Sequence, residues 1–241
     1  MRIALIADLH GNRPATLALE QDLLITQPEE IWCLGDLVGK GPANVETYEW
    51  ALAHCSLVLG GNWDYGLGEM RYPNDEFYWG QLGAERLEKL RSLPREATVD
   101  FAGRRIRLLH GRPVMPSLLR VSSEQEELQA LFSSPEGETW DMVIYADTHR
   151  QALRTLTPGY LVNIGSVGNA LGEVHGCYLL LEGERDRKSP LDIRFRQFEY
   201  DTETAALEAL EAGERGLPNG DFFAREVRTG RYARRFPPQG E

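Results

Sequence analysis

Short apolar segments that end at polar residues recur along this chain, and they constrain its fold more than any other feature. Uninterrupted apolar runs of this length are typical of strands buried on both faces of a sheet. They are Ile3–Ala7, Ile31–Leu34, Leu57–Leu59, Met142–Ala146 and Tyr160–Val162, and Ile106–Leu109 joins them although it contains Arg107. The pattern predicts a buried, largely parallel sheet with polar residues gathered where the strands end.

Helical patterns lie between the first of these segments. Asn12 is placed to cap a helix with Pro14 in its first turn, and Asn44 is placed to cap a second helix. Further on, Ser123 and Glu126 have the spacing of a capping box. Strand and helix thus alternate through the first 60 residues, which predicts βαβ units and an α/β fold.

The C-terminal third of the chain has a different character. Cys177–Glu182 and Ile193–Tyr200 follow one another without a helix, which predicts antiparallel pairing in a second sheet. A last helix is expected over residues 202–212, ending at Gly213. We expect one main domain over residues 1–200, with residues 201–241 packed on it as a helix and an arginine-rich tail.

The arginines of this tail leave two interpretations open. The segment Phe222–Phe236 holds five arginines and one acid. They are Arg225, Arg228, Arg231, Arg234 and Arg235. An arm packed on the acidic body of its own or a neighbouring chain is the more frequent case, and a partner-binding or phosphate-steering patch is the alternative.

Charge and composition exclude several classes of protein. The 241 residues carry a formal net charge of −11, which disfavours binding to long nucleic acid or to an anionic membrane. Three widely spaced cysteines form neither a disulfide framework nor a CxxC clamp. The first apolar run is too short for a signal peptide and reaches Asp8, so we expect a cytoplasmic protein.

Five of the strand ends carry side chains that bind divalent metals. These side chains are Asp8, His10, Asp36, Asn62, His110, Asp147 and His149. In open α/β sheets, residues far apart in sequence meet at the carboxyl ends of the strands. Imidazole and carboxylate together suit Mn, Fe, Zn or Co, and a shared carboxylate can bridge two ions. Each residue taken alone has an ordinary explanation as a cap, a turn or a core group, so the repetition carries the hypothesis.

The motifs at these strand ends resemble those of the calcineurin-like metallophosphoesterase superfamily, in particular its small bacterial and archaeal phosphodiesterase branch. The resemblance runs in order from residue 3 to about residue 180. It rests on the segments Asp8-Leu9-His10-Gly11-Asn12, 35–42 (GDLVGKGP), Gly61-Asn62-Trp63-Asp64, His110-Gly111, Ala146-Asp147-Thr148-His149 and 163–168 (NIGSVG).

This resemblance implies a four-layer αββα sandwich with two mixed sheets, and hydrolysis of a phosphate ester by a hydroxide held between two metal ions. Asp8, His10 and His149 would hold the first ion, Asp36 would bridge, and Asn62 and His110 would hold the second. Asp36, Asn62 and His110 would take the most direct part in catalysis. We expect two divalent ions, with Mn²⁺ preferred and Fe, Zn, Mg, Ni or Co as alternatives.

Two positions depart from the family pattern. Trp63 stands where the family usually has the histidine that protonates the leaving oxygen, and tryptophan cannot supply that proton. Asp147 stands where the family usually has a histidine ligand of the second metal. We therefore expect a phosphodiesterase, and we expect Asp147 to ligate a second ion that prefers Mn²⁺ or Mg²⁺ over Zn²⁺. The alternative is that Asp147 turns away from the metal.

Substrate contacts are expected from Asn12, Trp63, Arg112 and Arg150, which lie beside the proposed ligands. Six aromatic residues between positions 63 and 79 either stack on a nucleobase or pack in a core. The expected binding partner is a small phosphate ester, and we expect the protein to bind neither a membrane nor long nucleic acid. Self-association into a homo-oligomer is a further possibility. The rival functions are a phosphomonoesterase or dinucleoside polyphosphatase and, from another class, a non-catalytic scaffold on the same fold.

Overall fold

Two five-stranded mixed sheets face one another in a computed structural model that describes residues 1–115 and 117–233. The first sheet has the order β10-β9-β1-β2-β3 and the second has the order β4-β5-β6-β8-β7. The strands of the first sheet are β1 (Arg2–Ile6), β2 (Glu30–Cys33), β3 (Leu57–Val58), β9 (Gly176–Glu182) and β10 (Asp192–Phe198). Those of the second are β4 (Glu96–Phe101), β5 (Arg104–Leu109), β6 (Met142–Tyr145), β7 (Gln151–Thr155) and β8 (Tyr160–Ile164).

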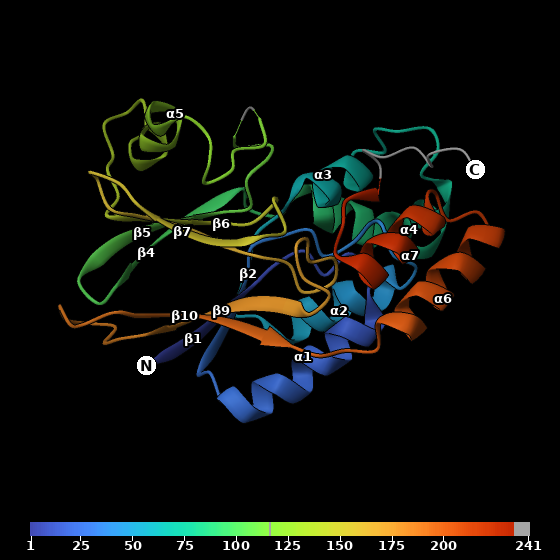
Figure 1. Cartoon of the computed structure of the whole chain (residues 1–241). Coiled ribbons are helices and arrows are strands. Elements are labelled where there is room, and N and C mark those ends of the chain that lie inside the picture. Colours follow the sequence, from blue (N-terminus) through green and yellow to red (C-terminus); the bar gives the residue numbers. More distant parts are fainter. Residues whose placement is uncertain (116, 234–241) are drawn as a thin grey trace.

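Helices cover both outer faces, so the fold has four layers (Figure 1). The first sheet carries α1 (Arg13–Thr26), α2 (Asn44–His54), α3 (Asn62–Gly68), α4 (Glu76–Arg91), α6 (Thr202–Glu214) and α7 (Gly220–Thr229). The second sheet carries α5 (Gln125–Gln129) and a 3₁₀ turn, Ala130–Phe132. The predicted four-layer αββα sandwich is confirmed.

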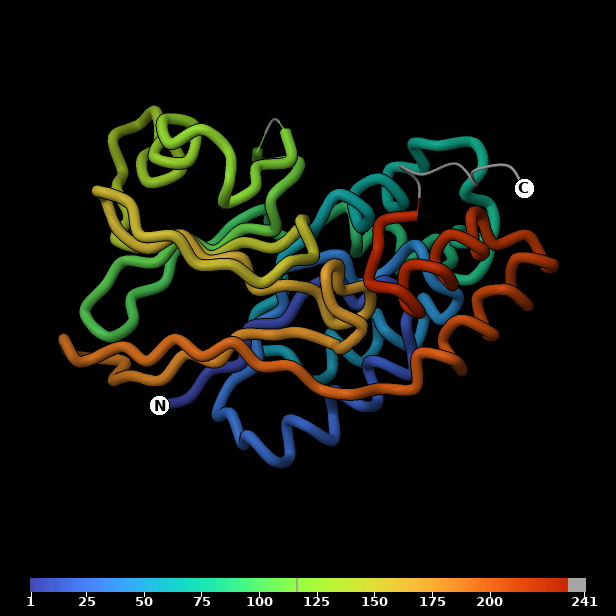
Figure 2. The backbone as a smooth tube through the Cα atoms, viewed as in Figure 1, coloured from blue at the N-terminus to red at the C-terminus, as the bar shows by residue number. Residues whose placement is uncertain are grey.

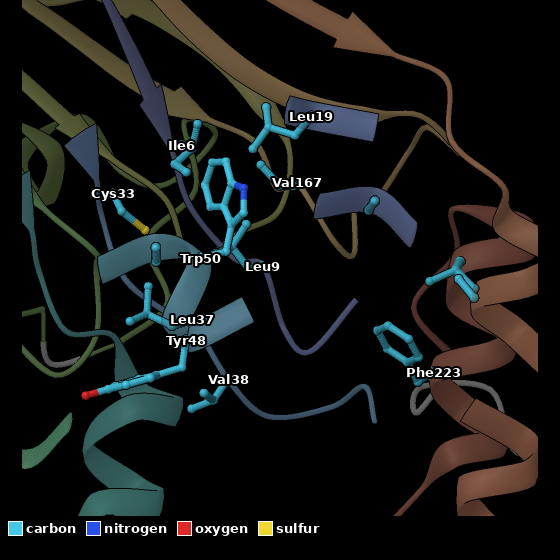
Figure 3. Close-up of a cluster of buried hydrophobic side chains, with 14 of the residues drawn as sticks. Ile6, Leu9, Leu19, Cys33, Leu37, Val38, Tyr48, Trp50, Val167 and Phe223 are labelled. Carbon is cyan, nitrogen blue, oxygen red and sulfur yellow. The ribbon is translucent and has the colours of Figure 1, made fainter. Parts of the chain in front are cut away.

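Alternation along β1 shows how one strand serves two layers. Ile3 and Leu5 point into the apolar layer between the sheets, and Ala4 and Ile6 point into the layer between the first sheet and its helices. Figure 3 shows the second of these layers, where Ile6 lies near Trp50 of α2. Because both faces are covered, the strand is apolar from Ile3 to Ile6, which explains the apolar run in the sequence.

The C-terminal strands pair as predicted but in a different sheet. β9 and β10 are antiparallel, yet β9 also pairs antiparallel with β1, so both strands extend the first sheet. The expectation that they form the second sheet is therefore wrong. The second sheet is formed instead by the central part of the chain, including β4 and β7, which the apolar runs did not indicate.

Helix boundaries follow local capping in some cases and tertiary contacts in others. The Oδ1 of Asn12 accepts from Ala15 N, which confirms the predicted cap of α1. Asn44 lies inside α2 and binds Gly39 N and Gly41 O instead of capping the helix. The predicted capping box is absent: α5 begins at Gln125, and Ser123 Oγ accepts from Arg120 N. α6 continues past Gly213 to Glu214.

The C-terminal helices belong to the same apolar core as the first sheet. Side chains of α6 and α7, among them Ala209 and Phe223, join the layer that contains Ile6. Arg228 of α7 forms an ion pair with Glu203 of α6, while the predicted tail residues Arg234 and Arg235 lie outside the described residues. Figure 2 traces the path of the chain from β10 through α6 and α7. Within the described residues, no helix is long and apolar enough to cross a membrane.

Candidate metal centre

The carboxyl ends of strands from both sheets bring the predicted ligands together. Strands β1, β2 and β3 are parallel neighbours in one sheet, and β5 and β6 are parallel neighbours in the other. Each of these strands ends just before a predicted ligand. The ligands are Asp8 and His10 after β1, Asp36 after β2, Asn62 after β3, His110 after β5, and Asp147 and His149 after β6.

Five of these residues hold an unusual backbone conformation. Their φ angles lie in the left-handed region, which non-glycine residues seldom adopt and which concentrates at functional sites. The residues are Asp8 (56°), His10 (50°), Asp36 (53°), Asp147 (64°) and His149 (59°). The chain therefore turns sharply after β1, β2 and β6, where these residues lie.

The first cluster consists of Asp8, His10 and His149, all buried. The Nε2 atoms of the two histidines lie 3.2 Å apart, and Asp8 Oδ1 lies 3.6 Å from His10 Nε2 and 3.4 Å from His149 Nε2. Each Nδ1 faces a backbone carbonyl, Val38 O at 3.2 Å and Asn169 O at 2.6 Å respectively. Donation from Nδ1 fixes the tautomer, so the Nε2 lone pairs point at the centre.

The second cluster shares Asp8 and adds Asp36 and His110. Asp36 Oδ2 lies 3.3 Å from His110 Nε2 and 3.6 Å from His10 Nε2, so it faces both clusters. His110 Nδ1 lies 2.9 Å from Leu34 O, which again leaves Nε2 facing inward. Asp8 is the residue common to both clusters, and the expected bridging role of Asp36 stays a prediction.

Several atoms at this centre are buried without any hydrogen-bond partner. They are both carboxylate oxygens of Asp8, Oδ1 of Asn62 and Nε2 of His110. Buried polar atoms normally find partners, because leaving them unsatisfied costs about 1–3 kcal/mol each. These donor atoms are the types that divalent cations bind, so the residues fit a metal ion.

The electrostatics of the centre favour added positive charge. Burial raises the pKa of Asp8 well above its ordinary value. Burial alone would lower the pKa of His110, but the carboxylates of Asp36 and Asp8 outweigh it and raise that pKa to about 10. Burial, with Lys40 nearby, lowers the pKa of His10 and of His149 well below the usual value, which keeps both rings neutral and able to ligate.

Asp147 reaches the site but binds Arg112. Arg112 Nη2 donates to Asp147 Oδ1 at 2.6 Å, and Arg112 Nε donates to Oδ2 at 2.8 Å. Burial would raise the pKa of Asp147, but the hydrogen bonds from Arg112 outweigh it and lower that pKa. Asp147 belongs to neither of the two clusters found among the described residues, and its expected role as a ligand stays a prediction.

Asp64 holds the loops that carry two ligands. Its buried carboxylate accepts hydrogen bonds from the backbone N–H groups of Asp36 at 2.7 Å, Leu37 at 3.0 Å and Gly61 at 2.8 Å. It thereby joins the turn after β2 to the turn after β3. The sequence placed Asp64 inside a motif, but its spacing gave no sign of this function.

The residues predicted to contact substrate divide into two groups. Trp63, Arg112 and Arg150 line one open cleft of about 1060 Å³. Asn12 is buried, because its Oδ1 caps α1 and its Nδ2 donates to Gly168 O at 2.7 Å. A substrate contact by Asn12 would therefore break one of these bonds.

The cleft also contains residues that the sequence did not single out. It opens beside the ligands Asp36, Asn62 and His149. The additional lining residues include Lys40, Arg71, Arg120 and Tyr232. Lys40 Nζ donates to Asn169 Oδ1 at 2.6 Å and lies 3.8 Å from Glu226 of α7. No periodicity or spacing connects these positions, so only folding brings them together.

The aromatic segment between positions 63 and 79 is mostly core. Tyr65 and Tyr78 are fully buried, and Phe77 and Trp79 pack against the layer between the first sheet and its helices. Tyr72 is 55% exposed and lines the cleft together with Trp63. The packing interpretation therefore holds for the two buried rings and for the partly buried rings of Phe77 and Trp79, whereas Trp63, which also packs partly against this layer, and Tyr72 line the cleft.

Comparisons with known proteins agree with this architecture. The family model "Calcineurin-like phosphoesterase superfamily domain" matches residues 1–186. The chain is 27% identical to the uncharacterized protein MJ0912 of Methanocaldococcus jannaschii over 229 residues, covering 84% of this chain and 89% of that protein.

Two solved structures have the same fold. The metallophosphoesterase from Sphaerobacter thermophilus has a TM-score of 0.73 and 25% identity, over 95% of this chain and 99% of that one. The hypothetical protein PH1004 from Pyrococcus horikoshii has a TM-score of 0.73 and 20% identity, over 96% and 98% of the two chains. With the family model spanning most of its length, this chain belongs to the calcineurin-like phosphoesterase superfamily.

Proposed function

We propose that this protein is a dimetal phosphodiesterase acting on a small ester. The observation that carries the proposal is the pair of buried clusters that share Asp8 and leave its two oxygens without hydrogen-bond partners. Asp8, His10 and His149 would hold one ion, and Asp36, with Asn62 and His110, would hold the other. Two divalent ions lower the pKa of water and stabilise charge on phosphoryl oxygens.

The chain's own residues would orient the ester around the ions. The guanidinium groups of Arg112 and Arg150 face the cleft and can each donate to phosphate oxygens. Lys40 and Arg150 also supply positive charge beside the predicted ligands, although the whole chain is acidic. A small anion is therefore attracted locally, without a basic surface.

A diester is favoured over a monoester by the environment of Trp63. Its indole lies edge-on to His10, with ring centroids 6.0 Å apart, where it can exclude water but cannot protonate a leaving group. Esters with good leaving groups depend least on protonation of the leaving oxygen. The volume of the cleft leaves room for a substituent on each side of the phosphate, as a diester requires.

A diester that contains a nucleoside is the substrate that the cleft suits best. Trp63, Tyr72 and Tyr232 lie along its wall, and a nucleobase stacked on an aromatic ring gains about 1–3 kcal/mol. Mn²⁺ is the metal we propose, because the ligands combine carboxylate and amide oxygen with imidazole nitrogen. The cytoplasmic location, the absence of membrane and long nucleic-acid partners, and self-association stay predictions.

A non-catalytic scaffold is the alternative from another class. A scaffold protein has no use for a buried carboxylate without hydrogen-bond partners, because burying such a group lowers the free energy of unfolding. The orphaned atoms of Asp8 therefore favour a working metal centre. A phosphomonoesterase or dinucleoside polyphosphatase would keep the same ligands and differ only in substrate.

The test combines metal analysis with turnover. Protein loaded in turn with Mn²⁺, Mg²⁺, Zn²⁺ and Fe²⁺ is analysed for bound metal and assayed with bis-p-nitrophenyl phosphate and p-nitrophenyl phosphate. We expect two ions per chain, with the diester preferred and Mn²⁺ the best activator. Asp36→Asn should lose metal, whereas Asp192→Asn, an equivalent change on exposed β10, should not.

Each contrary result selects an alternative. Preference for the monoester would identify a monoesterase, and cleavage of a dinucleoside polyphosphate in place of the diester would identify a polyphosphatase. If the protein binds no metal and hydrolyses neither ester with any of the ions, the non-catalytic scaffold would be the supported function.

A further inference from the structure

Arg112 and Asp147 form an ion pair at the cleft that contains three hydrogen bonds. Besides the two side-chain bonds, the backbone N–H of Arg112 donates to Asp147 Oδ2 at 3.0 Å. Both carboxylate oxygens therefore accept from the same residue, in the two-pronged geometry that fixes a guanidinium most firmly.

The two partners differ in exposure. The Asp147 side chain is 4% exposed, whereas the Arg112 side chain is 42% exposed and faces the cleft. A buried carboxylate thus fixes an arginine whose other side is open. Of the five N–H groups on a guanidinium, two are used by Asp147, and the others can donate to a bound anion.

The backbone around the pair is shaped to allow this approach. A Cβ at Gly111 would lie 2.7 Å from Asp147 Cβ and 2.8 Å from Asp147 Oδ2, so a side chain there would displace the carboxylate. Gly111 also has a φ of +141°, which L residues seldom adopt. Asp147 has a φ of 64°. Two adjacent strand ends, after β5 and β6, are therefore fitted to each other at this contact.

Asp147 differs from the carboxylate at the centre of the site. Both oxygens of Asp8 are buried without a hydrogen-bond partner, and its Oδ1 lies between 3.4 and 3.8 Å from the Nε2 atoms of three histidines. The oxygens of Asp147 already have partners, and no cluster among the described residues includes them. A carboxylate whose two oxygens each accept a hydrogen bond from the same guanidinium is a poor candidate for a metal ligand.

We propose that Asp147 is a positioning residue that holds the guanidinium of Arg112 at the cleft, where it binds a phosphoryl oxygen, and that Asp147 does not ligate metal. The proposal rests on the proposed function, since it deepens the role of the same site. The pair is neutral, so its carboxylate does not weaken the attraction of the metal centre for phosphate.

A double-mutant cycle tests this inference. The four proteins are the parent, Asp147→Asn, Arg112→Gln and the double variant, each loaded with Mn²⁺ and checked for folding by thermal unfolding. The readouts are the Kd of inorganic phosphate by calorimetry, the KM and kcat of bis-p-nitrophenyl phosphate, and the Mn²⁺ content per chain.

If Asp147 acts through Arg112, each single change weakens phosphate binding about 10-fold, the scale of one charge-assisted contact. The double variant then binds phosphate as Arg112→Gln does, KM rises more than kcat falls, and the Mn²⁺ content is unchanged. Arg112→Lys keeps the charge without the fork and should also be defective, which covers the case in which Arg112→Gln folds poorly.

Arg150→Gln supplies the matched control. Arg150 lines the same cleft, but within residues 1–115 and 117–233 its guanidinium has no carboxylate partner. Its effect should therefore add to that of Asp147→Asn, in contrast to the effect of Arg112→Gln.

Two results would overturn the inference and leave the proposed function intact: loss of one Mn²⁺ ion in Asp147→Asn but not in Arg112→Gln, or full additivity of the two changes. The first would make Asp147 a ligand, and the second would make the two residues independent. A parent protein that binds no Mn²⁺ and hydrolyses no ester would overturn both proposals together.

Discussion

Replacing Asp64 by alanine should destabilise the protein strongly, although Asp64 is not one of the predicted metal ligands. The carboxylate accepts three hydrogen bonds from the backbone at 2.7, 3.0 and 2.8 Å, and its residue is fully buried. The alanine variant leaves three buried N–H groups without an acceptor, and each such group costs about 1–3 kcal/mol.

The net loss should be smaller than the sum of these costs. Burial, and then the negative charge of Asp36, raises the pKa of Asp64 to about 7, so the native carboxylate is itself under electrostatic stress that the variant relieves. Water can also enter the space that the carboxylate leaves. We therefore expect a loss of about 3–5 kcal/mol in the free energy of unfolding.

Urea unfolding at neutral pH in a chelator measures this loss without a contribution from metal. Circular dichroism and tryptophan fluorescence should give one coincident transition. Asp64→Asn keeps one acceptor oxygen and should lie between the parent and Asp64→Ala. The exposed change Asp192→Asn should stay within about 0.5 kcal/mol of the parent.

The metal affinity should fall in the same variant, because Asp64 joins the turns that present Asp36 and Asn62. Calorimetry with Mn²⁺ on the folded fraction measures this second effect. A stability loss below about 1 kcal/mol, with unchanged Mn²⁺ affinity, would refute the view that Asp64 organises the site.

Three other changes have definite expected outcomes. Asp8→Asn should remove Mn²⁺ binding yet stabilise the metal-free protein by about 1–3 kcal/mol in chelator, because burial raises the pKa of the unsatisfied Asp8 carboxyl; a destabilised variant would contradict this. Asp22→Asn should cost about 2 kcal/mol near neutral pH. Burial would raise the pKa of Asp22, but hydrogen bonds from Arg196 and Tyr178 outweigh it and hold that pKa below 3.8. The stabilisation by the Asp22 carboxylate is therefore complete above pH 3.8, the pKa in the unfolded chain. It is lost as the pH falls through the lower pKa of the folded protein. Unfolding curves of parent and variant across acidic pH should therefore converge. Trp63→His should increase the turnover of phenyl phosphate by about 10²-fold through protonation of the leaving oxygen, with little effect on an activated diester; an equal change for both esters would argue against that role.

The sequence alone predicted much of this fold and of the ligand set. Its apolar runs located β1, β2 and β6, because the segments of a strand that are covered on both faces are apolar, and a similar run located β5 although that strand contains Arg107. The polar residues that follow these strands are the ones that meet at the centre. Both features are local, so they are visible in a single chain.

Strand partners were less predictable. β9 and β10 were expected in a second sheet, yet β9 pairs with β1. An antiparallel hairpin has the same local pattern whichever sheet it extends, so the choice depends on packing between distant parts of the chain. Asn44 similarly has the local signature of a helix cap, but it serves the Gly39–Gly41 loop, since these backbone groups lie within its reach in the folded protein.

The sequence by itself determined which side chains could bind a metal and that they stand at the ends of buried strands. The tertiary structure decided what each one faces. It gave Asp8 no hydrogen-bond partner, gave Asp147 the guanidinium of Arg112, buried Tyr78 and brought Tyr232 to the cleft. The physical reason is that the type of a residue fixes its chemistry, whereas its partners and its solvation depend on contacts between segments that lie far apart along the chain.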